Sequence, residues 1–201
     1  MLYIVGTAIG NIEDTSYRAI TTLTQADIIL AEDTRTFRTY YDRLQDLFDI
    51  RATKEQTVKS LYKENEFAMI SEVLEEIHLG KDVALVSESG MPAISDPGAL
   101  LIKHVRLNNF PYTVIPGPTA FATAAVHVGV PHSQIAFLGF LPKKESELLK
   151  LLNAVREAHY DNKTLYICYE SPHRYAQTVK LIKTQVRPSE FYLARELTKK
   201  I

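Results

Sequence analysis

The sequence predicts an α/β fold of two consecutive domains, in which helices pack on mostly parallel sheets. Short apolar runs alternate with longer amphipathic segments along all 201 residues, which is the pattern of strands and helices. The predicted strands are separated by helices of about ten residues or more, and such long crossovers join parallel strands. Pro116-Gly117-Pro118 directly follows one predicted strand, so we expect a boundary there between domains of residues 1–115 and 116–201.

In the first half, each strand is predicted from a short apolar run and each helix from apolar residues three or four positions apart. The clearest helix is Glu64–Leu79, where four apolar residues from Phe67 to Ile77 recur at helical spacing. Gly80 follows it, in the position typical of the glycine that ends a helix. The expected order is strand Leu2–Val5, a helix from Thr15 or Ser16 to about Gln25, strand Ile28–Ala31, helix Thr36–Leu47, a short extended piece at Ile50, helix Glu64–Leu79, strand Val83–Val86, a helix from Pro97 or Gly98 to about Leu107, and strand Tyr112–Ile115.

The same alternation continues after the Pro-Gly-Pro turn, without an internal repeat or a long linker. Apolar runs again predict strands, and amphipathic stretches of about ten residues or more predict the helices between them. The expected order is helix Thr119–Val128, strand Ile135–Phe140, helix Lys144–Ala158, strand Thr164–Tyr169, helix Arg174–Thr184 and strand Phe191–Ala194.

The composition is that of a folded protein without disulfides. Hydrophobic residues make up 46% and charged residues 23%, and 23 basic against 24 acidic residues leave a net charge of −1. This balance excludes a globally basic nucleic-acid coat and an acidic disordered tail. Cys168 is the only cysteine, so an internal disulfide is excluded. No apolar run reaches about 18 residues and the start lacks a basic leader, so we expect a cytoplasmic protein.

The balanced net charge conceals a difference between the two halves. Residues 1–140 carry 11 basic and 17 acidic residues, a net of −6, whereas residues 141–201 carry 12 and 7, a net of +5. Solvated helix faces explain part of this difference. A polyanionic partner bound by the second half is the functional explanation.

The loops that follow the predicted strands are rich in glycine, proline, hydroxyl and charged residues. In open α/β sheets, ligands bind beyond the carboxyl ends of the strands, so we expect these loops to form one cleft. The sequence lacks G-x-G-x-x-G, the P-loop, H-E-x-x-H, paired cysteines and G-x-S-x-G. It therefore predicts no metal site and no covalent nucleophile, and favours transfer of an already activated group. The loops are residues 6–11, 32–35, 87–98, 116–120, 169–174 and 195–199.

Together these loops and their strands resemble the bacterial ribosomal RNA small-subunit methyltransferase I family of tetrapyrrole-methylase-like (class III) methyltransferases. The resemblance follows the family's order over essentially the whole chain, through residues 2–11 with 31–35, 83–98, 115–120, 139–143, 169–174 and 195–199. It implies two α/β domains with S-adenosylmethionine bound in the cleft between them, usually in a homodimer. The implied activity is 2′-O-methylation of a cytidine ribose in 16S ribosomal RNA, so naked RNA or the small subunit is the expected partner.

The resemblance also implies which residues contact the cofactor. Ala8, Glu88 and Met91 depart from the family pattern, which usually has proline, aspartate and threonine at these positions. Family members commonly continue with further strands, so the chain is either a short member or lacks part of its second domain. The expected cofactor contacts are Ile9, Glu88, Gly90, Met91, Thr119, Ala120, Tyr169 and Leu197.

Methyl transfer to a hydroxyl requires in-line placement of the oxygen and removal of its proton. Asp33, Glu170 and His173 are the candidate bases, and each follows a predicted strand. Basic side chains that would contact phosphate or stabilise developing negative charge are Arg35, Lys143 and Arg174. Each of these six residues could instead belong to a surface ion pair.

Two other functions fit the same sequence. The first is a methylase of a tetrapyrrole or of a protein side chain, from the same superfamily. The second is a non-catalytic ribosome-binding module whose cofactor pocket is altered at Ala8, Glu88 and Met91. Titration with the cofactor distinguishes the second alternative, because only the enzymes require cofactor binding.

Overall fold

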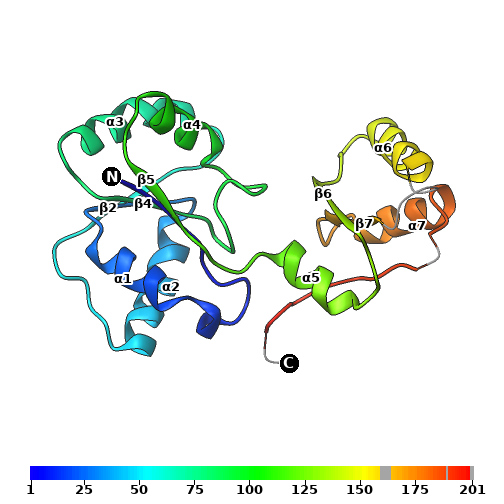
Figure 1. The fold of residues 1–201 in the computed structure, drawn as a ribbon, viewed down its shortest axis with the longest axis horizontal. Helices are drawn as coiled ribbons and strands as arrows, with labels where there is room; N and C mark the ends of the chain where they lie inside the picture. The colour runs from blue at the N-terminus through cyan, green and yellow to red at the C-terminus, as the bar shows by residue number, and fades with distance from the viewer. Residues whose placement is uncertain (159–163, 189, 200–201) are drawn as a thin grey trace. The chain divides into compact units, whose positions relative to one another are not determined.

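The computed structural model describes residues 1–158, 164–188 and 190–199, and they form two compact units (Figure 1). The first unit comprises Met1–Ala120 and the segment that starts at Glu196. The second unit comprises Phe121–Arg195. That residues 1–115 and 116–201 are separate domains remains a prediction.

A five-stranded parallel sheet forms the centre of the first unit, with the strand order β3-β2-β4-β1-β5. Leu2 of β1 lies opposite Val83 of β4 on one side and Tyr112 of β5 on the other. The elements in chain order are β1 (Leu2–Val5), the 3-10 turn η1 (Ile12–Asp14), α1 (Tyr17–Gln25), β2 (Ile28–Ala31), α2 (Thr34–Phe48), β3 (Thr57–Ser60), α3 (Glu66–His78), β4 (Val83–Val86), α4 (Ala99–Leu107) and β5 (Tyr112–Ile115).

Helices cover both faces of this sheet, which explains why β2 and β4 consist only of apolar residues, all of them buried. One core lies between the sheet and α1 with α2, and includes Ile20, Leu23 and Leu44. The other lies between the sheet and α3 with α4, and includes Val73 and Leu101. Figure 1 shows the pair α3 and α4 on one side of the strands and the pair α1 and α2 on the other.

The helix ends follow from identifiable side chains. Ser16 caps α1 by accepting a hydrogen bond from the N–H of Ala19 (3.1 Å). Gly80 follows α3 with φ +84°, as the sequence predicts. The helix α4 begins at Gly98, which has no side chain to cap it. Instead, buried Glu66 accepts hydrogen bonds of 2.9–3.0 Å from the N–H groups of Gly98, Leu100 and Leu101.

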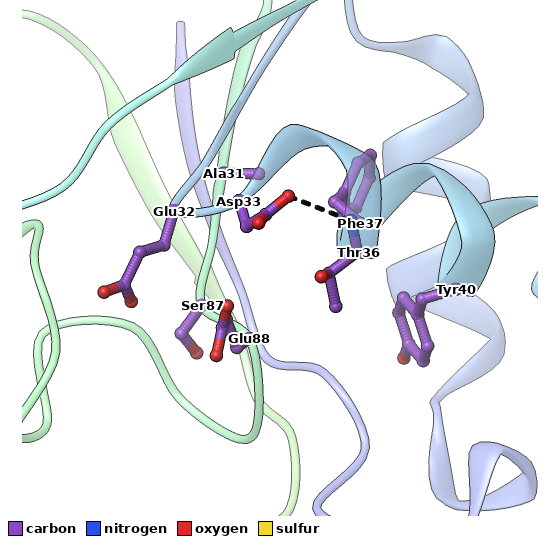
Figure 2. Close-up of a pocket in the computed structure, with 8 residues that line it drawn as sticks. All are labelled: Ala31, Glu32, Asp33, Thr36, Phe37, Tyr40, Ser87 and Glu88. Carbon is purple, nitrogen blue, oxygen red and sulfur yellow. Dashed lines mark hydrogen bonds between the residues drawn. The ribbon is translucent and has the colours of Figure 1, made fainter.

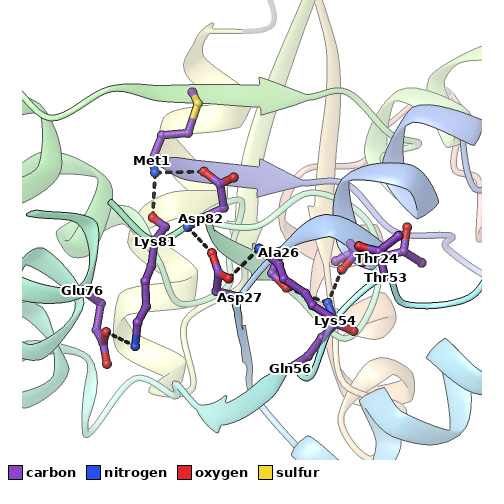
Figure 3. Close-up of polar contacts among 11 residues, drawn as sticks. Met1, Thr24, Ala26, Asp27, Thr53, Lys54, Gln56, Glu76, Lys81 and Asp82 are labelled. Atoms are coloured by element: carbon purple, nitrogen blue, oxygen red, sulfur yellow. Dashed lines mark hydrogen bonds and ion pairs between the residues drawn. The ribbon is translucent and has the colours of Figure 1, made fainter. Parts of the chain in front are cut away.

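Polar contacts also hold the amino-terminal edge of the sheet together (Figure 3). Asp27, just before β2, accepts a hydrogen bond of 2.8 Å from the N–H of Asp82, just before β4. Lys54 forms an ion pair with Asp27 at 2.5 Å, and Gln56 donates to the carbonyls of Leu23 and Ala26 at 2.7 Å. These charges stabilise the fold at the edge opposite to the strand-end loops.

In the described part of the second unit, two parallel strands form a small sheet that packs with helices. Its strands are β6 (Gln134–Phe140) and β7 (Thr164–Tyr169), and its helices are α5 (Ala120–Val128), α6 (Glu145–Ala158) and α7 (Tyr175–Gln185). Leu141, Leu148 and Leu152 form its buried core, against which Cys168 and Leu181 pack. Within the described residues, no helix combines the length and the low polarity that a membrane crossing requires.

Most predicted elements are confirmed to within two residues at each end, and the expected parallel pairing is confirmed. Two predictions are wrong. Ile50 lies in irregular backbone after α2, and the strand of this region is β3 at Thr57–Ser60. Residues 191–194 form no strand, because neither β6 nor β7 pairs with them and their side chains are exposed.

Candidate functional site

The candidate ligand-binding site of the first unit lies at the carboxyl ends of β1 and β4. These two strands are neighbours, but the chain continues from β1 to α1 on one face and from β4 to α4 on the other. Such a divergence opens a crevice between the two loops. The loops also contact each other, because the N–H of Thr7 donates to the carbonyl of Gly90 at 2.8 Å.

The loop after β5 joins the same place. A Cβ atom on Gly6 would lie 2.7 Å from the backbone of Gly117, so the loops after β1 and β5 are in direct contact. The N–H of Gly117 donates to the Sδ atom of Met91 at 3.2 Å. Three loops that the sequence predicted to converge are therefore packed together in the first unit.

Gly90 lies at the centre of this arrangement and is buried, with φ +82°. Only glycine adopts this conformation at little cost. A Cβ atom at Gly90 would lie 3.2 Å from Cγ2 of Ile9 and 3.3 Å from the carbonyl oxygen of Pro118. Because Gly90 has no side chain, the loops after β1 and β5 pack closely against its backbone.

A pocket opens beside these loops, between the end of β2, the start of α2 and the end of β4 (Figure 2). Three carboxylates and two aromatic rings contribute to it, and none of its eight lining residues is basic. Such a lining favours a cation over an anion as the ligand. The lining residues are Ala31, Glu32, Asp33, Thr36, Phe37, Tyr40, Ser87 and Glu88.

Tyr40 connects this pocket to the loop after β1. Its hydroxyl accepts a hydrogen bond of 3.2 Å from the N–H of Ala8 and lies 2.7 Å from the hydroxyl of Thr15. Burial raises the pKa of the Tyr40 phenol, so the group stays protonated. One side chain from α2 therefore fixes the backbone of a loop that belongs to another strand.

Negative charges accumulate around the pocket. Burial, together with the neighbouring carboxylates of Glu32 and Glu88, raises the pKa of Asp96 to about 6. Burial, with the charges of Glu88 and Glu64, also raises the pKa of Glu32. Their mutual repulsion is relieved when a positive charge binds among them.

Seven of the eight predicted cofactor contacts belong to the first unit. Ile9 and Gly90 are close neighbours, Met91 contacts Gly117, and Glu88 lines the pocket. The carbonyl of Leu197 occupies the space beside Gly10, so the last motif also lies on the loop after β1. Thr119 and Ala120 are partly buried at the start of α5. Tyr169 alone belongs to the second unit, where its hydroxyl accepts from the N–H of Phe121 at 3.2 Å.

Two of the candidate catalytic residues, Glu170 and Arg174, bind each other. The guanidinium of Arg174 contacts Glu170 through Nε (2.9 Å) and Nη2, and also donates to the carbonyls of Leu141 and Pro142. Thr178 donates to the other oxygen of Glu170 at 2.7 Å. Burial opposes the charge of Glu170, but these hydrogen bonds outweigh it and lower the pKa of its carboxyl. The geometry gives this pair a structural role in joining two loops.

Asp33 likewise has a structural contact. Its Oδ1 atom caps α2 by accepting from the N–H groups of Arg35 (2.7 Å) and Thr36 (3.1 Å). These two hydrogen bonds lower the pKa of the Asp33 carboxyl, so it is a weak base. The side chain of Arg35 is exposed on the first turn of the same helix.

The remaining candidates, Lys143 and His173, are exposed in the second unit. The backbone N–H of His173 donates to the hydroxyl of Ser171 at 3.3 Å. Its imidazole makes no hydrogen bond to any other part of the chain that the structure describes. Of the three candidate bases, Asp33 and Glu170 therefore use their side chains in hydrogen bonds that stabilise the fold, whereas His173 does not.

Sequence reasoning missed several residues of the pocket, chiefly Glu32, Phe37 and Tyr40. A signal was present, since Asp33 caps α2 and positions 36, 37 and 40 follow it on the same side of the helix. Asp96 lies within the motif of residues 83–98, and its partial burial depends on the tertiary fold. Among the described residues, no group of three or more histidine, cysteine or acidic side chains is placed to hold a metal ion.

Comparison with known proteins gives concordant results. The family model for tetrapyrrole (corrin/porphyrin) methylases matches residues 1–200. A Hydrogenobaculum protein named ribosomal RNA small subunit methyltransferase I is 39% identical over 98% of this chain and 81% of its own length. A protein of the same name from Halalkalibacterium halodurans is 38% identical over 98% of this chain and 64% of its own length. The solved structure of uroporphyrin III C-methyl transferase from Thermus thermophilus matches with a TM-score of 0.50 and 19% identity, over 71% of this chain and 60% of that one, which supports the fold alone.

Proposed function

The chain belongs to the tetrapyrrole (corrin/porphyrin) methylase family, and from this membership we propose that it methylates the RNA of the small ribosomal subunit with S-adenosylmethionine as donor. The proposal rests on relatives of that name that align with nearly the whole chain. We further propose that the acceptor is the 2′-oxygen of a cytidine ribose, expected at cytidine 1402 of 16S ribosomal RNA.

One structural observation supports the cofactor assignment: the loops after β1, β4 and β5 pack together at Gly90, beside a pocket lined by three carboxylates. S-adenosylmethionine carries a sulfonium and an ammonium group, and both positive charges suit the neighbourhood of Glu32 and Glu88. The residues therefore fit the cofactor, and Ile9, Gly90 and Met91 would hold it. When bound, it supplies a methyl group on a positively charged sulfur that leaves as a neutral thioether. Its place in a cleft between two domains stays a prediction.

The chain's own residues would orient the ribose and accept its proton. Asp33 and Glu170 are held by hydrogen bonds that lower their pKa values, so neither is suited to take a proton from a hydroxyl. We therefore assign the general base to His173, whose imidazole is exposed and uncommitted among the described residues. Lys143 would contact the phosphate backbone, because it is exposed on the loop after β6.

The experiment is a methylation assay with isolated small subunits and S-adenosylmethionine carrying a labelled methyl group. We expect label in 16S ribosomal RNA, on the 2′-oxygen of one cytidine. Label in an added tetrapyrrole would instead favour a tetrapyrrole methylase, and the absence of both label and cofactor binding would favour the non-catalytic ribosome-binding module. His173→Gln should bind cofactor and RNA normally but transfer methyl groups much more slowly.

Two further expectations belong to this proposal. The chain forms a homodimer, as most symmetric oligomers are pairs, and light scattering at micromolar concentration tests it. The protein acts in the cytoplasm, where ribosomal subunits are assembled, and fractionation of the source cells tests that.

A further inference from the structure

The carboxyl end of the small sheet in the second unit carries exposed aromatic and basic side chains together. Phe140, the last residue of β6, is 58% exposed, and Tyr175, at the start of α7, is 43% exposed. Lys143, Lys144 and His173 are exposed on the intervening loops. We call Phe140, Lys143, Lys144, His173 and Tyr175 the strand-end surface.

The two loops that carry this surface are held against each other. The guanidinium of Arg174 donates to the carbonyls of Leu141 (2.9 Å) and Pro142 (3.1 Å), which lie between Phe140 and Lys143. The N–H of Leu141 donates to the carbonyl of Tyr169 at 3.1 Å. Glu170 neutralises Arg174 and holds it in place. Exposed residues on either side of Arg174 are therefore positioned before any partner binds, which lowers the entropy cost of binding.

Phe140 is also supported from behind by other rings. Its ring centroid lies 5.5 Å from that of Tyr169, which lies 4.8 Å from Phe137, which in turn stacks on Phe121 at 4.5 Å. The contact between Phe140 and Tyr169 is edge-to-face, with 65° between the ring planes. This packing restrains the orientation of Phe140 while most of its surface remains exposed.

The charge of the loop is suited to a polyanion. Lys144 forms an ion pair of 3.3 Å with Glu147, an exposed contact of little strength that a phosphate can replace. The carboxylate of Glu170, the acidic group of the second loop, is already paired with Arg174. The positive charges of Lys143 and Lys144 thus face solvent, three and four positions after Phe140 in the sequence.

We infer that the strand-end surface binds single-stranded RNA by stacking an unpaired base on Phe140, with Tyr175 as a second ring, while Lys143 and Lys144 contact the flanking phosphates. This inference rests on the proposed function and adds to it the form of the substrate. Aromatic rings beside basic residues are how proteins bind unpaired strands, because every base has a face that stacks. A duplex hides its base faces, so it can use only the lysines. The lysines also disfavour a symmetric contact of this surface with itself in a second copy of this chain, because the same positive charges would meet one another.

The test compares binding of a fluorescein-labelled single-stranded oligoribonucleotide with binding of the same sequence as a duplex, by anisotropy. The variants are Phe140→Leu, Phe140→Tyr and Tyr175→Ser, with Phe67→Leu as the matched control. Phe67 is 73% exposed on α3 of the first unit, far along the chain from the strand-end surface. Thermal melting of each variant and light scattering verify the fold and the oligomeric state.

We expect Phe140→Leu to weaken single-strand binding about five- to a hundredfold, the loss typical of one base–aromatic stack, with duplex binding unchanged. Phe140→Tyr should retain wild-type binding, Tyr175→Ser should weaken it, and Phe67→Leu should not change it. If Phe140→Leu does not fold, Tyr175→Ser decides alone. Unchanged single-strand binding in the variants, equal affinity for the duplex in the wild type, or dissociation of a dimer by Phe140→Leu overturns the inference.

The methylation assay separates this inference from the proposed function. A wild-type protein that methylates small subunits, together with variants that bind and methylate like it, refutes the stacking surface alone. A protein that binds single strands through Phe140 but places no label in ribosomal RNA refutes the proposed substrate and leaves the surface in place.

Discussion

The hydroxyl of Tyr40 accepts a hydrogen bond of 3.2 Å from the backbone N–H of Ala8. The two residues belong to α2 and to the loop after β1, so the contact fixes the loop to which we assign cofactor binding from a neighbouring element. Proline, which the family usually has in place of Ala8, restricts φ and has no N–H. Here the hydrogen bond that the Ala8 N–H donates to a partly buried tyrosine restrains the loop.

Tyr40→Phe should therefore weaken binding of S-adenosylmethionine about two- to tenfold, the effect of losing one hydrogen bond. Calorimetric titration measures it, and in the methylation assay KM for the cofactor should rise more than kcat falls. The matched control is Tyr41→Phe, which removes a hydroxyl that donates to Gln56 at 2.8 Å. That variant should lose stability and keep its cofactor affinity. Equal effects of both variants on the cofactor would contradict a specific role for Tyr40.

A second prediction compares two glycines with nearly the same backbone conformation, Gly90 (φ +82°) and Gly80 (φ +84°). Alanine at either position should cost about 1 kcal/mol or more of unfolding free energy, because φ is positive in both. A Cβ atom at Gly80 meets nothing within 4 Å, whereas at Gly90 it meets Ile9 and Pro118. Only Gly90→Ala should thus weaken cofactor binding, and Gly90→Val should abolish it. Normal cofactor affinity in Gly90→Val would refute the assigned site.

A third prediction concerns the salt dependence of RNA binding. Replacing Lys143 and Lys144 together with alanine should weaken binding and lower the slope of log affinity against log salt by about 1.4, since each phosphate contact contributes about 0.7 for single strands. Cofactor affinity should not change, because the cofactor carries no phosphate. Lys63→Ala with Lys103→Ala removes the same charge from exposed positions of the first unit and is the control. An unchanged slope in the Lys143/Lys144 variant would make these lysines ordinary solvated charges.

A fourth prediction follows from Asp96, whose pKa is raised to about 6 by burial and by Glu32 and Glu88. The folded state then binds this proton more tightly than the unfolded state, so stability falls as pH rises from about 4 to 6. Asp96→Asn should raise the unfolding free energy by about 1–2 kcal/mol at pH 8 and by little at pH 4. Urea titrations at the two pH values measure the difference.

Asp27 is the control of opposite sign. The hydrogen bond from Lys54 lowers the pKa of its carboxyl, so its contribution to stability is present at neutral pH and is lost in acid. Asp27→Asn should destabilise the protein at pH 8. The same pH response in both asparagine variants would mean that the acidic environment of Asp96 is wrongly described.

A fifth prediction addresses the start of α4. Glu66→Ala leaves three N–H groups without their acceptor, and we expect a loss of about 2–3 kcal/mol in unfolding free energy. Glu66→Gln keeps an acceptor oxygen and should lose less. Because α4 is held at its beginning by this side chain, hydrogen exchange should accelerate first at Leu100 and Leu101. Uniform acceleration across the unit would argue against a local capping role.

The sequence predicts those parts of the fold in which local pattern and burial agree. Strands β2 and β4 are wholly apolar and central, so their limits are predicted to the residue. The edge strand β3 was missed because Thr57–Ser60 is short and polar and pairs only with β2. Residues 191–194 were wrongly predicted as a strand, because apolar residues form a strand only where a neighbouring strand pairs with them.

The candidate site was predictable in its loops and less so in its individual side chains. Glycine and proline motifs marked the backbone turns around Gly90 because turn chemistry is local. The roles of Glu170 and Arg174 were not predictable, since their mutual contact and the carbonyls of Leu141 and Pro142 depend on tertiary structure. Tyr40 was not predicted for the same reason, because its contact with Ala8 also depends on tertiary structure.

The position of β1 in the sheet has a consequence for synthesis. Strand β1 lies between β4 and β5, and Leu2 pairs with Val83 and Tyr112. It cannot pair with β4 until Val83–Val86 has been translated, nor with β5 until Tyr112–Ile115 has been translated. The amino-terminal segment must therefore stay extended or bound by chaperones during elongation, and we expect the first unit to fold in one late step after β5 has left the exit tunnel.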